Sequence, residues 1–340
     1  MCYADDTDHF DINNRVRVTS LEKTVKSNSA PDWLKDGLLN TVGCCNNLTL
    51  YYDSTKVDRK KLVDYLLDLE DQFGDLSASK VPCRRIELPI SFQSKEQDEA
   101  NKRYQETSRP YAPYLPKNFD FVAKNNAFSV EQLKKCYLGG DFITVFVGFY
   151  CGLPDAIPVD PRNRFFAPKY NPSRVFTPEG TVGLGGGAIA IYPVDSPGGY
   201  QMNGRTIPCW DYYGWKGGFT PESPWLFQDF DLIRFYEVSE QELNDEILKF
   251  RAGKYNFEWE DTEMDMVEHN KLLKDTAEEV QRLRKDQKKA QDEMVEEDNR
   301  TLEKCREEKA KHQVDEGTIE KLLEGKSAVS LIVHLKPVTY

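Results

Sequence analysis

The stretch Thr177-Pro-Glu-Gly-Thr-Val-Gly-Leu-Gly-Gly-Gly-Ala-Ile-Ala-Ile-Tyr-Pro193 contains the strongest fold signal in this chain. Its strand-forming residues, Ala188–Tyr192, follow a group of glycines and end at a proline. Short apolar runs bounded by Pro and Gly are typical of a β-barrel or a β-sandwich. The glycines superficially match a dinucleotide-binding fingerprint, but that fingerprint requires a helix directly after it. Because a strand is predicted there instead, we expect no nucleotide to bind at this stretch.

The same pattern extends outward over residues 104–236. Sixteen of the 18 prolines lie between Pro82 and Pro224, and short apolar runs such as Phe142–Phe149 and Ile233–Tyr236 alternate with turn residues. Several short strands with this punctuation predict a β-rich unit. We therefore assign residues 101–240 to a β-barrel domain.

The N-terminal part differs in kind. Residues 1–30 are polar without a clear period and predict a loosely packed arm. Asp58 is a suitable N-cap for a helix over 59–73, which Gly74 ends, and residues 86–92 alternate as a strand does. Residues 31–100 thus predict a small α+β domain with an antiparallel sheet.

The C-terminal part is highly charged. Residues 254–316 contain neither Gly nor Pro and have only a thin apolar stripe, which predicts a long charged helix over 241–316. Such a helix either packs on its own barrel or serves as a docking arm for a second chain, including a second copy. Residues 317–340 predict a helix/strand tail. A chain that ends after Phe257 should keep a folded core.

Composition excludes several classes of protein. The 57 acidic residues exceed the 45 Lys and Arg, and a net charge of −12 argues against nucleic-acid binding. No apolar run is long enough to span a membrane, and the acidic N-terminus lacks a signal-peptide pattern, so we expect a cytoplasmic protein. Eight cysteines without a C-x-x-C pattern predict reduced thiols, and four scattered histidines favour no metal site.

The densest functional signal is Lys169-Tyr-Asn-Pro-Ser-Arg174. Two cations and an amide lie within six residues, and prolines at 168, 172 and 178 restrict the backbone. Such a group suits a carboxylate or a carbonyl oxygen. The alternative is a pair of surface charges on a proline-ordered loop.

Many further blocks occur in the order found in one known family. They are Arg109-Pro-Tyr-Ala-Pro113, Pro158-Val-Asp-Pro-Arg162, Thr177-Pro-Glu-Gly-Thr-Val-Gly183, Ser196-Pro-Gly-Gly-Tyr-Gln201 and Gly204-Arg-Thr206. With them the chain resembles the carboxyltransferase region of urea carboxylase (urea amidolyase) over about residues 33–291. It is most similar to the half related to allophanate hydrolase subunit 1, to bacterial 5-oxoprolinase and to the kinase-A inhibitor. The resemblance implies an α+β N-terminal domain followed by a cyclophilin-like β-barrel.

The resemblance also implies an activity. Members of this family move a carboxyl group from carboxybiotin to urea, in a site shared with a second, related half. The 340 residues contain no Met-Lys-Met tripeptide to carry biotin, and Gly148–Pro154 matches the bacterial relatives only in part. We therefore expect no covalently bound cofactor, carboxybiotin on a partner, and a small urea- or amide-containing substrate. Without carboxybiotin, the same pocket would serve amide hydrolysis, lyase chemistry or cyclisation.

Roles for individual residues follow from this reading. Lys169 and Arg174 are expected to hold a carboxylate and Asn171 to orient the amide, as the catalytic group. Backbone N–H groups near Gly185, Gly186 and Gly187 would stabilise an oxyanion, and Tyr192 and Tyr200 would form walls. The candidates for a general base are Asp160 and Asp195, and the substrate site also includes Arg162, Gln201 and Arg205. Lys169→Ala and Arg174→Ala should abolish activity at a nearly unchanged melting temperature. The alternative function is a non-catalytic regulatory or scaffolding subunit that binds a partner protein.

Overall fold

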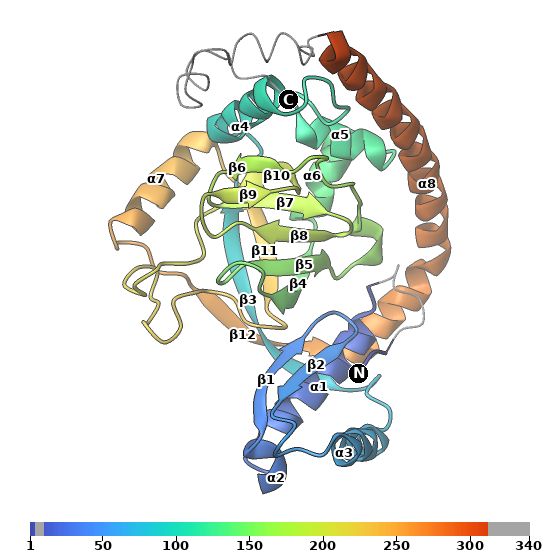
Figure 1. The fold of residues 1–340 in the computed structure, drawn as a ribbon, viewed down its shortest axis with the longest axis vertical. Coiled ribbons are helices and arrows are strands. Elements are labelled where there is room, and N and C mark those ends of the chain that lie inside the picture. Colours follow the sequence, from blue (N-terminus) through green and yellow to red (C-terminus); the bar gives the residue numbers. More distant parts are fainter. Residues whose placement is uncertain (4–9, 312–340) are drawn as a thin grey trace, which may run out of the picture.

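The computed structural model describes residues 1–3 and 10–311. Its centre is a mixed sheet with the strand order β10-β7-β8-β5-β4-β11-β3-β12 (Figure 1). β11 runs parallel to β3, and the other neighbouring strands are antiparallel. The strands are β3 (Lys80–Ile90), β4 (Asp141–Val147), β5 (Pro154–Pro158), β7 (Thr181–Gly185), β8 (Ala188–Ile191), β10 (Gln201–Arg205), β11 (Leu232–Glu237) and β12 (Trp259–Asp265).

The sheet curves strongly, but its ladder of strands is open. Its two ends are different strands, β10 and β12. Ser91, directly after β3, and Arg205 in β10 exchange two backbone hydrogen bonds of 2.9 Å, which brings the far end of β3 against β10. The closed cyclophilin-like barrel expected over residues 101–240 is therefore not confirmed. Pro and Gly spacing predicts strands, whereas closure depends on pairing between strands far apart in sequence, including β3 from outside the predicted barrel.

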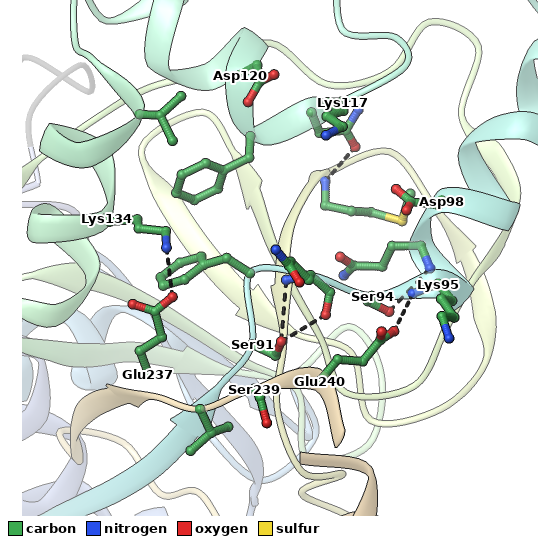
Figure 2. A pocket seen from close by; sticks show the side chains of 18 of the residues that line it. Ser91, Ser94, Lys95, Asp98, Lys117, Asp120, Lys134, Glu237, Ser239 and Glu240 are labelled. Atoms are coloured by element: carbon green, nitrogen blue, oxygen red, sulfur yellow. Dashed lines mark hydrogen bonds and ion pairs between the residues drawn. The ribbon is translucent and has the colours of Figure 1, made fainter. Parts of the chain in front are cut away.

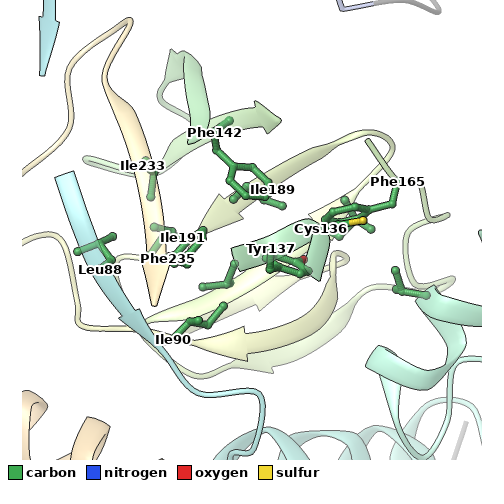
Figure 3. Packing of buried hydrophobic residues seen from close by; sticks show 14 of the residues in the cluster. Leu88, Ile90, Cys136, Tyr137, Phe142, Phe165, Ile189, Ile191, Ile233 and Phe235 are labelled. Carbon is green, nitrogen blue, oxygen red and sulfur yellow. The ribbon is translucent and has the colours of Figure 1, made fainter. Parts of the chain in front are cut away.

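The core lies between the sheet and three helices, α4 (Lys95–Thr107), α5 (Asn118–Asn125) and α6 (Val130–Leu138). Figure 3 shows Tyr137 of α6 among apolar side chains of β3, β4, β8 and β11. Its ring centroid lies 4.9 Å from that of Phe165 and 5.8 Å from that of Phe142. Burial of each such side chain stabilises the fold by roughly 1.5–3 kcal/mol. A capping box between Ser129 and Gln132 fixes where α6 begins.

The N-terminal residues differ from the expected arm. Residues 12–26 form helix α1, which buries Ile12, Val16 and Leu21. The apolar period is diluted because α1 also buries Arg15, whose charge Asp229 neutralises at 2.9 Å. The unit is completed by α2 (Asp32–Lys35), β1 (Leu38–Gly43), β2 (Leu48–Tyr52) and α3 (Arg59–Phe73).

Helix α3 confirms the helix predicted over 59–73. The Asp58 side chain accepts a 2.8 Å hydrogen bond from the Lys61 amide, and Gly74, with φ of 56°, ends the helix. β1 and β2 form an antiparallel pair in the same unit. β3, in contrast, leaves this unit and crosses the main sheet, so the predicted domain of residues 31–100 does not keep all of its strands together (Figure 1).

The long helix predicted over 241–316 is divided. α7 (Glu240–Arg251) is followed by strand β12, which pairs with β3, and only then by α8 (Met266–Lys311). The acidic sequence of β12 resembles the adjoining helix in composition, which is why the strand was missed. The predicted tail of residues 317–340 lies outside the described residues.

Helix α8 is packed along the body instead of projecting from it. It runs from the α1 unit to the neighbourhood of α5 (Figure 1). Met266, His269 and Met294 are buried under it. Among residues 1–3 and 10–311, no helix combines the length and the apolar character needed to cross a membrane.

Candidate functional site

Three of the residues predicted from the sequence meet at one cavity of about 400 Å³. Lys169, Tyr192 and Tyr200 line it together with Asp155, a residue that sequence reasoning missed. The remaining walls come from two loops and from the ribbon of β6 (Arg174–Thr177) and β9 (Ser196–Gly198). They are Phe146, Phe149, Tyr150, Leu153, Ser173, Ala190, Pro197, Gly198 and Gly199.

Tyr200 owes its position to a glycine. A Cβ atom at Gly185 would lie 2.4 Å from two ring carbons of Tyr200, so only glycine allows the ring to lie against β7. The Tyr200 hydroxyl donates a 3.4 Å hydrogen bond to Oδ1 of Asp155. Tyr192 approaches the same ring edge-on, with centroids 6.4 Å apart. The glycine stretch therefore shapes the cavity wall.

Asp155 is a carboxyl group in an otherwise apolar strand. It lies in β5 opposite Ala190 of β8. Burial raises its pKa to about 6, against the smaller opposite effects of the Tyr200 hydrogen bond and the Lys169 charge. A carboxylate with this proton affinity is suited to accept a proton near neutral pH. The available signal was the single charge in Pro154-Asp-Ala-Ile-Pro158.

Asp160 and Asp195, the two bases expected from the sequence, lie outside this cavity. Asp160 caps a short 3-10 helix, η1 (Pro161–Asn163), and pairs with Arg162 at 2.7 Å. Although burial opposes it, this bonding to Arg162 holds the pKa of Asp160 below its ordinary value. The Asp195 carboxylate accepts a 2.8 Å hydrogen bond from the Glu179 amide.

Lys169 is exposed and has an ammonium group available to a ligand. Its Nζ lies 5.0 Å from the centroid of the Tyr200 ring. Among the described residues, no carboxylate forms an ion pair with it. Lys169 thus combines an uncompensated positive charge with a place on the cavity wall.

Arg174 does not share this position. Its side chain is buried behind the wall, where Nη1 donates to the Tyr200 carbonyl at 2.7 Å and Nη2 to the Thr177 hydroxyl at 3.1 Å. Its Cζ also lies 4.2 Å from the centroid of the Tyr170 ring. The expectation that Lys169 and Arg174 hold one carboxylate together therefore lacks support, and Arg174 acts through the backbone of Tyr200.

The other predicted residues also lie outside the cavity lining. Asn171 is exposed, and its carbonyl accepts a 3.1 Å hydrogen bond from Arg109. The Gly186 amide already donates to the Ala167 carbonyl at 2.9 Å, so it is not free for an oxyanion. Gly187 packs against Phe166, Gln201 donates to the Pro168 carbonyl, Arg162 also faces Glu279, and Arg205 pairs with Glu96.

A second, larger cavity of about 820 Å³ lies between the first turns of α4, α5, α6 and α7 (Figure 2). Lys134 pairs there with Glu237 at 2.7 Å, and Glu240 accepts the Lys95 amide at 2.6 Å. The N-termini of α4, α6 and α7 are already capped by serines. None of the site residues predicted from the sequence lines this cavity, so we assign the chemistry to the smaller one.

Comparison with known proteins agrees with the residues at this site. The family model described as carboxyltransferase domain, subdomain C and D, matches residues 3–216. A protein of Emericella nidulans named "Putative urea carboxylase" is 53% identical over 318 residues, which cover 92% of this chain and 26% of the relative. The urea amidolyase of Saccharomyces cerevisiae is 36% identical over 243 residues, covering 71% of this chain and 13% of the relative.

Solved structures agree with this relationship. The crystal structure of the Kluyveromyces lactis urea carboxylase matches with a TM-score of 0.75 at 30% identity, over 85% of this chain and 25% of that one. The chain thus spans about a quarter or less of the length of these relatives. Given the family match over residues 3–216, this chain belongs to the carboxyltransferase domain family, as its subdomains C and D.

Proposed function

We propose that this chain forms one half of a carboxyltransferase site of the urea carboxylase type, which acts on a small urea- or amide-containing substrate. The observation that supports this most is the meeting of Lys169, Asp155 and Tyr200 at one cavity in a chain of this family. The carboxyl donor, carboxybiotin, would come as a substrate on a partner. The cavity suits such chemistry because it has a free ammonium group, a carboxyl group and aromatic walls.

Each residue has a chemical role in this proposal. The Lys169 ammonium binds the carboxylate that is transferred and stabilises its negative charge. Asp155 accepts the proton that the substrate nitrogen loses as its new bond to the carboxyl carbon forms, and then returns that proton to the leaving nitrogen of the donor. Tyr192 and Tyr200 exclude water, which would otherwise hydrolyse the donor. Without a carboxyl donor, the same groups would serve amide hydrolysis, lyase chemistry or cyclisation.

The surface beside the cavity supports a second half as partner. Phe149, at the cavity mouth, is 86% exposed, and Trp215 is 75% exposed. The two loops that carry them meet where Gly152 packs against Trp210 and Trp225. Exposed aromatic side chains gathered beside a pocket mark a protein interface. We assign this face, Phe149 with Tyr212, Tyr213 and Trp215, to the second carboxyltransferase half and call it the aromatic face.

A transfer assay tests the proposal. The chain is mixed with the remaining carboxyltransferase part of the Emericella nidulans relative, and loss of labelled carboxyl from carboxybiotin is followed with and without urea. We expect urea-dependent loss that requires both proteins. Loss that does not depend on this chain would contradict the proposal, and a series of other small amides would define the substrate.

A further inference from the structure

Helix α8 is fastened to the body at two separate places. Near its middle, Arg284 donates to the carbonyls of Pro161, at 2.7 Å, and Arg164, at 3.1 Å. Farther along, Asp298 pairs with the buried Arg109 at 2.6 Å. These anchors hold the helix at a fixed distance from the body over the turns between them.

A cavity of about 280 Å³ lies under the helix next to the second anchor. It differs from the two cavities described above because its walls are mainly apolar, and α8 forms one side of it. Met294 and Phe121 are buried in these walls, while Val295 is 58% exposed at the rim. The apolar wall residues are Tyr114, Phe121, Phe166, Pro168, Met294 and Val295.

The charges around this cavity are already occupied. The Asp298 carboxylate is neutralised by Arg109, and Lys169, which borders both this cavity and the candidate site, has its ammonium over the Tyr200 ring. A charged ligand would therefore lose its hydration without gaining an ion pair. An uncharged apolar molecule would instead gain contacts with several rings and with the Met294 side chain.

Size separates a small molecule from a protein segment. Pockets for small molecules measure roughly 300–1,000 Å³, so this cavity is at the lower end of that range. A partner's helix is about 10 Å wide with its side chains and would not fit beneath α8. We propose that the space between α8 and the body is a binding site for a small, uncharged, mainly aromatic molecule, placed next to the segment that carries Lys169.

Indole is a suitable probe, and the five methionines of the full chain offer a direct signal. In a titration followed by NMR of methyl-labelled methionines, the Met294 methyl signal should shift saturably with indole. The Met266 signal is the internal control, because Met266 is buried in the same helix and does not line the cavity. A Met294 signal that stays unchanged, or that moves no more than that of Met266, overturns the proposal.

Two matched variants locate the site. Val295→Trp places a large side chain at the cavity rim, while Val267→Trp makes the same change at a residue of α8 that is 55% exposed and does not line the cavity. Indole should bind at least about tenfold more weakly to Val295→Trp and equally well to Val267→Trp. Equal affinity for both variants also overturns the proposal. Because only binding is measured, the result is independent of carboxyl transfer.

Discussion

At the scale of single residues, Asp155 should make stability depend on pH. Its folded pKa of about 6 exceeds the ordinary 3.8, so the folded chain binds this proton more tightly than the unfolded chain does. The free energy of unfolding should therefore fall as pH rises between these values, by up to about 2 kcal/mol after allowance for solvent screening. Asp155→Asn should remove this part of the dependence, as urea unfolding at several pH values would show. An unchanged pH profile in the variant would contradict the assignment.

Arg174 should matter for stability more than its place in the sequence suggests. Arg174→Ala leaves the Tyr200 carbonyl and the Thr177 hydroxyl without their buried donor. We expect a loss of about 2–4 kcal/mol in the free energy of unfolding. Arg162→Ala is the control, because that half-exposed side chain pairs at the surface and should cost about 1 kcal/mol or less. Equal losses in thermal or urea melts would show that Arg174 is not structural.

The sequence predicted part of the candidate site. Lys169, Tyr192 and Tyr200 were found because proline and glycine around them signal a shaped loop, and they do meet at the cavity. Arg174 was misplaced because its spacing from Lys169 does not tell which side of a short strand it faces. Asp155 was missed because a single acidic residue in a strand has no local signature, and its pKa depends on burial by residues distant in sequence.

At the scale of elements, α8 and β12 should be part of the folded core. Met294→Ala removes a buried side chain of α8 and should cost about 2–5 kcal/mol, whereas Val295→Ala, at an exposed neighbour, should change stability by about 0.5 kcal/mol or less. A chain ending after Phe257 also loses the β12 pairing with β3 and should lack a cooperative melt, contrary to the expectation from sequence. Circular dichroism would decide, and a cooperative transition in the truncated chain would show that the core folds without α8 and β12.

Elements with strong local signals were predictable. α3 has an N-cap, an apolar stripe and a terminal glycine, and its bounds were correct. α1 was missed because its buried face includes Arg15, Thr19 and Glu22, and partners elsewhere in the fold neutralise or bond two of these groups. The thin apolar stripe of α8 predicts weak packing, but its polar anchors to backbone carbonyls cannot be predicted from sequence.

At the scale of the whole molecule, the aromatic face should bind the second carboxyltransferase half. Trp215→Ala should weaken that complex by at least about tenfold, because exposed aromatic side chains dominate such interfaces. Trp259→Ala on β12, where the tryptophan is 49% exposed, is the control. Calorimetry or size exclusion would measure both. Equal effects would move the interface away from the aromatic face. No sequence pattern indicates this face, since its two loops meet only in the folded chain.

The central claim is that the cavity of Lys169, Asp155 and Tyr200 carries the proposed carboxyl transfer. The most direct test is kcat/KM for urea-dependent transfer by the complex with the second half, compared between Lys169→Ala and Lys288→Ala. Lys288 is an exposed lysine of α8 outside the cavity. Lys169→Ala should lower kcat/KM by about 10²–10³ at an unchanged melting temperature, while Lys288→Ala should leave it near that of the wild type. Wild-type kcat/KM in Lys169→Ala would contradict the account.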